Sequence, residues 1–106
     1  MTALTTWSEA VRNWAASNPK VSEVFIIGSW ATGRATADSD LDIAVLLLDG
    51  HGYSDWFYES ETWRAELDML VAPPVHLLRG GGSLENSVVE AAILEHGVLV
   101  YRRNKP

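Results

Sequence analysis

The sequence predicts an α/β fold in one small domain, and three observations lead to that prediction. Apolar, β-branched segments alternate along the chain with segments of helical periodicity, as in domains that pack helices on a sheet. The 106 residues leave room for one hydrophobic core, so one domain over residues 1–106 is expected. An apolar fraction of 47% and a charged fraction of 21% are those of a folded globular protein.

The N-terminal half is predicted to contain two helices and two strands in alternation. Thr6 and Glu9 have the spacing of a capping box, and apolar residues then recur near the helical period until Asn18-Pro19 stops the helix. The predicted elements are a helix over Thr6–Ser17, a buried strand over Val21–Ile27, a short helix from Ser29 to about Arg34, a loop over Ala35–Ser39 and a central strand over Leu41–Leu48.

The C-terminal half gives a weaker pattern. Strict alternation of apolar and polar residues over Thr62–Val71 predicts a third strand, which Pro73-Pro74 would end. The remaining predicted elements are a turn at Asp49–Gly52, one irregular helical turn over Tyr53–Glu61, a helix over Leu84–Glu95 with Ser83 as its N-cap, and a final strand over Val98–Tyr101.

The segment GSWATGRATADSDLD, from Gly28 to Asp42, combines a glycine-hinged turn with two carboxylates on a strand. Backbone N–H groups at a helix start favour an anion, so Gly28-Ser29 is a candidate phosphate-binding turn. Successive side chains alternate across a strand, so Asp40 and Asp42 are expected to share a face. Paired carboxylate oxygens suit Mg²⁺. The segment therefore predicts transfer chemistry at a nucleotide phosphate.

Charge and composition exclude several classes of protein. The net charge of −6 argues against direct binding of nucleic acid, and the basic residues Arg102, Arg103 and Lys105 are interpreted as a solvated terminus. No cysteine is present, which excludes disulfides and thiolate metal sites. The sequence shows no secretory leader and no apolar stretch of membrane-spanning length, so a cytoplasmic protein without a membrane partner is expected.

The compound pattern resembles a known family. Gly-Ser, ten residues, Asp-x-Asp, a later Asp in the apolar segment LDMLV and the closing segment AAILEHGVLVY look like the DNA polymerase β-like nucleotidyltransferase superfamily. The short length is similar to that of its minimal nucleotidyltransferase (MNT) branch. The resemblance covers most of the chain, and it implies the polymerase β-like fold, a mixed β-sheet with flanking helices.

The resemblance also implies roles for individual residues. Gly28 and Ser29 would hold the β- and γ-phosphates of ATP, and Asp40 and Asp42 would bind a pair of Mg²⁺ ions. Asp68 would be the third catalytic carboxylate, which binds the metal that activates the acceptor hydroxyl and takes the hydroxyl proton. The alternating pattern supports this trio, because it places Asp68 on the polar face of a neighbouring strand.

Several residues depart from the family pattern or stay open to two interpretations. Many relatives have a basic residue where this chain has Thr32, and Arg34 is expected to contact the phosphates instead. Glu66 shares the polar face of Asp68 and is the rival third carboxylate, while Arg64 either contacts a phosphate or forms a salt bridge there. The residues left without a role, or assigned mainly to packing, are His51, His76 and His96, and Trp56, Phe57 and Tyr58.

The resemblance implies an enzyme whose acceptor is brought by another protein. Minimal members of the family are commonly encoded beside a HEPN ribonuclease, with which they resemble an antitoxin–toxin pair. The expected reaction moves AMP from ATP to a tyrosine of that partner within a hetero-oligomer. Two alternatives stay open: an antitoxin that acts by contact alone, and a small-molecule (antibiotic) nucleotidyltransferase subunit. The acidic trio favours the enzyme over the contact-only antitoxin, because a pure binder gains nothing from clustered carboxylates.

Overall fold

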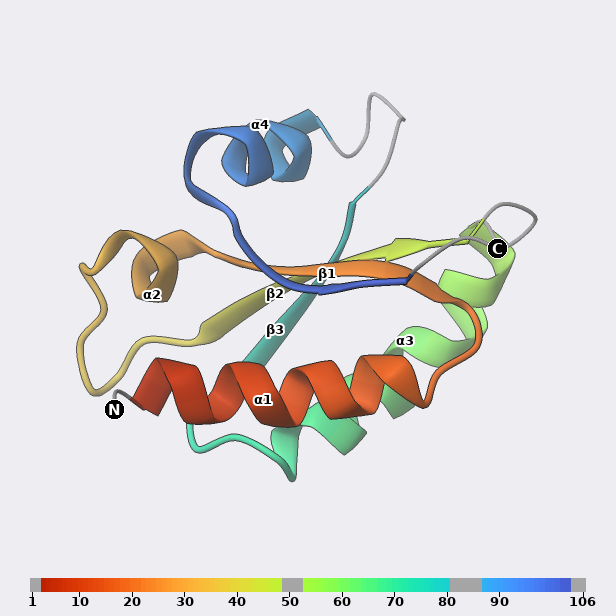
Figure 1. The fold of residues 1–106 in the computed structure, drawn as a ribbon, viewed down its shortest axis with the longest axis horizontal. Helices are drawn as coiled ribbons and strands as arrows, with labels where there is room; N and C mark the ends of the chain where they lie inside the picture. The colour runs from red at the N-terminus through yellow and green to blue at the C-terminus, as the bar shows by residue number, and fades with distance from the viewer. Residues whose placement is uncertain (1–2, 49–52, 81–86, 104–106) are drawn as a thin grey trace.

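The computed structural model describes residues 3–48, 53–80 and 87–103, and a four-stranded sheet of order β3-β2-β1-β4 forms its centre (Figure 1). The strands are β1 (Val21–Ile27), β2 (Leu41–Leu47), β3 (Val75–Arg79) and β4 (Val98–Arg102), and the helices are α1 (Ala3–Ala16), α2 (Gly28–Thr32), α3 (Tyr53–Asp68) and α4 (Ser87–His96). β1 is antiparallel to β2 and β4, whereas β2 and β3 are parallel. The expected mixed sheet with flanking helices is confirmed.

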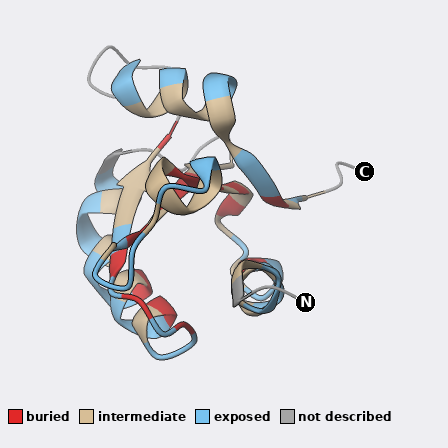
Figure 2. Cartoon of the chain, turned by 90° about the vertical axis from the view of Figure 1, so that its left-hand side faces the viewer, coloured by how far each residue is buried: buried red, intermediate tan, exposed pale blue. Residues whose placement is uncertain are grey.

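The helices form a layer on each face of the sheet. α1 and α3 cover one face, and α4 lies over the other (Figure 1). Buried residues lie mainly in the strands and on the inner sides of α1 and α3, whereas α4 has no buried residue (Figure 2). The core cluster consists of Val11, Ala15, Val21, Val24, Ile26, Leu41, Ile43, Val45, Leu67, Val71, Val75 and Val100. In the described ranges, no helix has the length and apolar character needed to cross a membrane.

The strand predicted over Thr62–Val71 is wrong, because α3 occupies most of this segment. Trp63, Leu67 and Val71 are only 4%, 0% and 7% exposed, and a spacing of four residues places side chains on one side of a helix. Met69 belongs to the same alternating apolar series, yet it is 88% exposed. Burial therefore follows the helical period, and the strand β3 begins only after the proline pair.

The other predicted elements have mixed outcomes. The predictions for α1, β1, α2, β2 and β4 are confirmed within a few residues, as is the described part of α4. The irregular turn expected over Tyr53–Glu61 is instead the first half of α3. Trp56 packs against the core as expected, but Phe57 and Tyr58 are 64% and 78% exposed. The turn at residues 49–52 and the cap at Ser83 lie outside the described residues.

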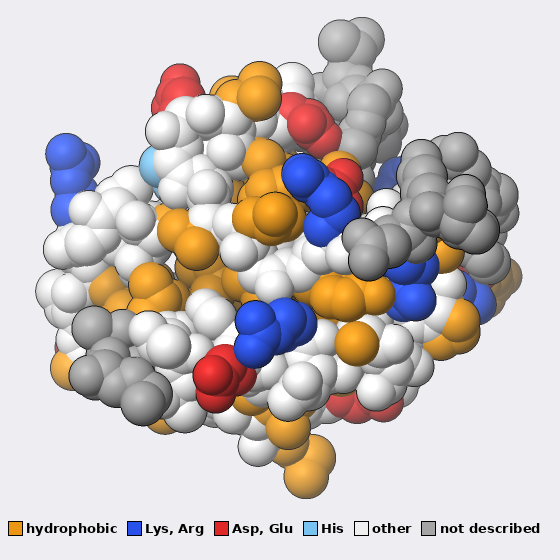
Figure 3. Space-filling model, in the orientation of Figure 1, with side chains coloured by type: hydrophobic (Ala, Val, Ile, Leu, Met, Phe, Trp, Pro, Cys, Tyr) orange, Lys and Arg blue, Asp and Glu red, His pale blue; other side chains and the backbone are white. Residues whose placement is uncertain are grey.

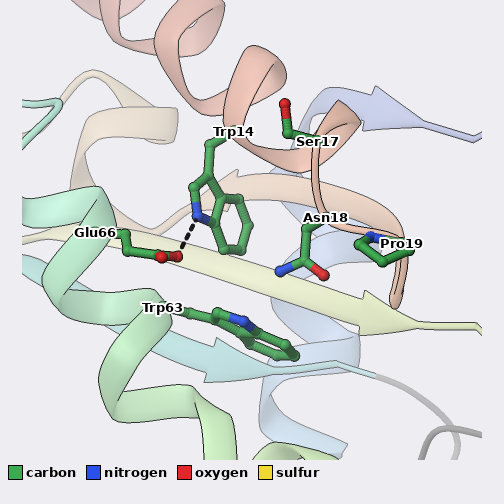
Figure 4. Close-up of a pocket in the computed structure, with 6 residues that line it drawn as sticks. All are labelled: Trp14, Ser17, Asn18, Pro19, Trp63 and Glu66. Carbon is green, nitrogen blue, oxygen red and sulfur yellow. Dashed lines mark hydrogen bonds between the residues drawn. The ribbon is translucent and has the colours of Figure 1, made fainter.

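A cavity of about 310 Å³ opens between the C-terminal end of α1 and α3 (Figure 4). Its lining residues are Trp14, Ser17, Asn18, Pro19, Trp63 and Glu66. Trp14 Nε1 donates a hydrogen bond of 2.9 Å to Glu66 Oε1, and the rings of Trp14 and Trp63 meet edge to face with centroids 6.1 Å apart. This cavity lies on the α1 and α3 side of the sheet.

Candidate active site

Gly28 and Asp42 meet where β1 gives way to α2. The antiparallel register pairs Ile27 with Asp42, which brings the start of β2 beside the glycine turn. Gly28 has a φ of +74°, and a Cβ atom added to it would lie 2.1 Å from Oδ2 of Asp42. Only glycine avoids both the left-handed strain and this clash. The motif recognised in the sequence therefore folds into a direct contact between the turn and the carboxylate.

α2 and the loop that follows it connect the turn to Asp40. The backbone carbonyl of Ser29 accepts a hydrogen bond of 2.9 Å from the N–H of Arg34, just after the C-terminal end of α2. Trp30 Nε1 donates a hydrogen bond of 3.3 Å to the carbonyl of Ser39, the residue before Asp40. The side chains of Arg34 and Asp40 are exposed. Two candidate residues at the end of α2 and at the entrance to β2 are thus accessible to a ligand from solvent.

His76, for which the sequence pattern indicates no role, lies beside Asp42. The parallel register of β2 and β3 pairs these two residues, and His76 Nδ1 is 3.1 Å from Oδ1 of Asp42. Leu41 and Ile43 belong to the core cluster on the α1 and α3 side, and successive side chains alternate across a strand. The side chains of Asp42 and His76 therefore share the opposite face of the sheet.

The C-terminal end of α4 reaches the same glycine turn. His96 Nε2 accepts the backbone N–H of Gly28 at 3.0 Å. A ring nitrogen that accepts a hydrogen bond carries no proton, so the proton of the neutral imidazole is assigned to Nδ1 in this arrangement. The next residue, Gly97, leaves no room for a side chain, because a Cβ atom there would be 2.7 Å from the carbonyl of Ile93. The N–H of Gly97 donates to that same carbonyl at 3.0 Å and so ends α4, and the His96 side chain connects this end of the helix to the glycine turn.

The two residues considered for the third carboxylate, Asp68 and Glu66, lie on α3, which covers the other face of the sheet (Figure 1). Asp68 Oδ1 accepts the N–H of Val75 at 2.8 Å, and Asp68 Oδ2 accepts a hydrogen bond of 2.5 Å from Arg64. Glu66 accepts the indole N–H of Trp14. The expectation that Asp68 stands beside Asp42 on a neighbouring strand is wrong, because its carboxylate joins the end of α3 to the start of β3.

Arg64 forms salt bridges rather than facing the glycine turn. It bonds Asp68 and, through Nε at 2.8 Å, Glu61 on the preceding helical turn. The hydrogen bond and positive charge of Arg64 lower the pKa of Glu61. The salt-bridge interpretation of Arg64 is therefore confirmed for Asp68, with Glu61 rather than Glu66 as the second partner.

Asp68→Ala is expected to lower the free energy of unfolding by about 1–3 kcal/mol, because the N–H of Val75, a buried residue, loses its acceptor. Denaturant unfolding measures this change. Glu61→Ala is the matched control: it also removes a partner of Arg64, but the Glu61 side chain is 80% exposed and should contribute less than about 1 kcal/mol. An Asp68→Ala variant that kept full stability but lost cation-dependent nucleotide binding would return Asp68 to the active site.

The donor groups around Gly28 suit a divalent cation in kind. Asp42 and His76 offer a carboxylate and an imidazole 3.1 Å apart, and Asp40 adds a second carboxylate two residues before Asp42. The side chains of Asp42 and His76 are 25% and 58% exposed, so an ion from solvent can reach the pair. Across residues 3–48, 53–80 and 87–103, no three His, Asp or Glu side chains are already gathered as a metal site. The chemistry of these donors therefore fits a divalent cation. Asp42 is the donor whose position is fixed by two neighbours, Gly28 and His76.

Solved structures of similar fold include antitoxin complexes. One, a toxin–antitoxin complex with AMP-PNP, has a chain of 21% identity and TM-score 0.63; the match covers 92% of the present chain and 74% of the other. A second, from Shewanella oneidensis, is a tri-AMPylated HEPN toxin in complex with MNT antitoxin, at 16% identity and TM-score 0.62, covering 96% and 74%. A third, the toxin–antitoxin MntA-HepT, has 17% identity and TM-score 0.60, covering 94% and 73%. At these identities the likeness shows the fold.

Comparison with family models gives the family. No curated protein sequence matches the chain. The model for polymerase beta nucleotidyltransferases matches residues 9–106, which include every element from the middle of α1 to the end of β4. This match contains the glycine turn, both aspartates of the Asp-x-Asp motif and His76. The chain therefore belongs to the polymerase beta nucleotidyltransferase family.

Proposed function

We propose that the chain transfers AMP from ATP to a tyrosine hydroxyl of a HEPN-type toxin and so acts as its antitoxin. The observation that carries this proposal is the contact between Gly28 and Asp42 in a chain that belongs to the polymerase beta nucleotidyltransferase family. In this contact, a turn that can bind a phosphate lies beside a carboxylate that can hold a cation. Chemistry at a nucleotide phosphate requires both groups.

Each residue of the site has a role in this proposal. Gly28, which has no side chain, lets the β- and γ-phosphates approach the turn, the N–H and hydroxyl groups of Ser29 hold them, and the exposed Arg34 adds a cationic contact. Asp40 and Asp42 would hold Mg²⁺, which when bound neutralises phosphate charge and stabilises the entering and leaving oxygens. The acceptor oxygen bonds to the α-phosphorus, the bond from that phosphorus to pyrophosphate breaks, and the hydroxyl proton passes to solvent water.

The neighbours of similar fold support a HEPN partner and a nucleotide substrate. Two of them are described as a toxin–antitoxin complex with AMP-PNP and a tri-AMPylated HEPN toxin with its MNT antitoxin. The net charge of −6 also suits contact with a basic, RNA-binding partner better than contact with RNA itself. The partner would bring the acceptor tyrosine to the solvent-accessible side of Asp42 and Asp40.

His96 is expected to hold the phosphate turn in its binding conformation. His96→Ala removes the acceptor of the Gly28 N–H, and we expect a loss of about fivefold in ATP affinity, the equivalent of one hydrogen bond. His96→Gln should keep most of the affinity, because its amide oxygen can reach the position of Nε2. Calorimetric titration with ATP, together with melting curves, measures both. Equal ATP affinity in His96→Ala and wild type would limit His96 to packing α4 on the sheet.

Pyrophosphate release tests the proposed reaction. The chain, a HEPN protein that binds it, ATP and Mg²⁺ are mixed, and free pyrophosphate is measured with a coupled enzyme assay. The proposal predicts release that depends on all components and is lost when Asp42 is changed to asparagine. Neutralisation of the toxin without pyrophosphate release would favour the contact-only antitoxin. Release with an aminoglycoside in place of the HEPN protein would favour the small-molecule enzyme.

A further inference from the structure

We propose that His76 is a protein ligand of the cation held at Asp42, and that its imidazole shifts the preference of this site from Mg²⁺ toward first-row transition ions such as Mn²⁺. The inference rests on the proposed function, because it takes Asp40 and Asp42 as cation ligands. It adds a third residue that the sequence pattern did not indicate.

The strand register places His76 where a further ligand is needed. β2 and β3 are parallel, and Asp42 and His76 are register partners on adjacent strands. Their side chains share the face opposite the core cluster, and Nδ1 of His76 lies 3.1 Å from Oδ1 of Asp42. Two donors fixed by neighbouring strands of one sheet keep their relative positions more strictly than donors on loops.

The carboxylates first considered for this position are engaged elsewhere. Asp68 bonds the N–H of Val75 and the guanidinium of Arg64, and Glu66 bonds the indole of Trp14. All of these contacts belong to α1, α3 or the start of β3, on the side of the sheet away from the Asp42 side chain. His76, by contrast, is 58% exposed beside Asp42 and is open to an ion from solvent.

The identity of the donor predicts the choice of ion. Mg²⁺ is bound almost entirely by oxygen ligands, whereas Mn²⁺ and later first-row ions bind imidazole nitrogen as well as carboxylate. A site built from carboxylates alone gives imidazole-binding ions no advantage of this kind. A site of Asp42, His76 and Asp40 offers oxygen and nitrogen together, and it is therefore expected to bind Mn²⁺ more tightly than Mg²⁺.

Calorimetric titration of the full chain with Mn²⁺ and with Mg²⁺ tests the inference on four variants beside wild type. His76→Ala should lose about tenfold or more in Mn²⁺ affinity and little in Mg²⁺ affinity, and His76→Asp should reverse the preference. His76→Asn is the matched control, because its amide can still donate to Asp42 but offers no imidazole nitrogen, so it should behave like His76→Ala. The exposure of His76 predicts that all three variants fold, which melting curves check.

The outcomes separate this inference from the proposed function. If His76→Asn binds Mn²⁺ as tightly as wild type does, His76 is only a hydrogen-bond partner of Asp42 and the inference is wrong. If the fourth variant, Asp42→Asn, binds both ions as wild type does, the site itself is misplaced and the proposed function fails with it. A direct readout is available by proton NMR: substoichiometric Mn²⁺ should broaden the ring signals that disappear in His76→Asn, and sharp signals would overturn the ligation.

Discussion

Gly28→Val is expected to abolish ATP binding and to lower the melting temperature by at least about 5 °C. A residue with a Cβ atom at φ +74° is strained by about 1–2 kcal/mol, and in a domain of this size each kilocalorie lowers the melting temperature by about 4–8 °C. The added Cβ would also stand 2.1 Å from Oδ2 of Asp42, so either the turn or the carboxylate must move. Movement of the turn displaces the groups proposed to hold phosphate, and movement of the carboxylate displaces the group proposed to hold the cation. Scanning calorimetry and ATP titration measure the two effects.

Gly33→Val is the matched control for that experiment. Gly33 has a φ of +78°, almost the same as Gly28, but nothing lies within 4 Å of the position of its Cβ. This variant therefore carries the backbone strain without the collision at Asp42. It should be destabilised yet still bind ATP when folded. If both variants lost ATP binding to the same degree, the contact between Gly28 and Asp42 would have no special importance for the nucleotide.

Asp42→Asn is expected to lower cation-dependent ATP affinity more than about 100-fold while leaving the fold intact. Loss of a residue that only hydrogen-bonds to a metal ligand costs about 10–100-fold in metal affinity, and removal of the ligand charge itself should cost more. Asparagine has the same shape and keeps an oxygen for His76, so stability should not fall. Calorimetric titration with ATP, in the presence and absence of Mg²⁺, measures the change.

Asp38→Asn controls for a general effect of charge. Asp38 is exposed in the loop between α2 and β2, close in sequence to Asp42 but outside the strand. Its replacement removes the same charge and should leave ATP affinity within about twofold, since exposed charges are screened by solvent and salt. If Asp42→Asn and Asp38→Asn behaved alike, the role of Asp42 as a cation ligand would have to be abandoned.

The sequence was sufficient to predict an element where its residue pattern fits only one kind of secondary structure. The apolar segments of β1 and β2 form the two central strands of the sheet. These strands are antiparallel, and their register brings Asp42 beside the glycine turn. The segment from Trp63 to Val71 was ambiguous, because apolar residues two apart include a set four apart. Trp63, Leu67 and Val71 belong to both series, and only packing against α1 and the sheet selects the helical one.

The two histidines of the site could not be predicted from local sequence. His76 is 34 residues from Asp42, and His96 is 68 residues from Gly28. Neither separation resembles a ligand motif, and each contact depends on strand register or on where α4 ends. The alternating pattern places the third strand at Thr62–Val71 rather than at Val75–Arg79, so it assigns to Asp68 the position that His76 occupies beside Asp42. A correct placement of β3 after Pro73-Pro74 would have revealed His76.

Exposed apolar side chains lie on the edge strand β4 and on the neighbouring helix α4. Figure 3 shows apolar side chains interspersed with Lys and Arg on one face, and exposed apolar residues include Val98 and Leu99 of β4 and Leu94 of α4. β4 is at one edge of the sheet, where its backbone can still pair.

The mass of the partner protein tests the central claim most directly. A HEPN protein that binds this chain is incubated with it, ATP and Mg²⁺, and the intact mass of the HEPN protein is measured. The account predicts an increase of about 329 Da for each AMP added, on a tyrosine, with no increase when Asp42→Asn replaces the wild type. An unchanged partner mass under conditions where the toxin is neutralised would contradict the account and leave an antitoxin that acts by contact alone.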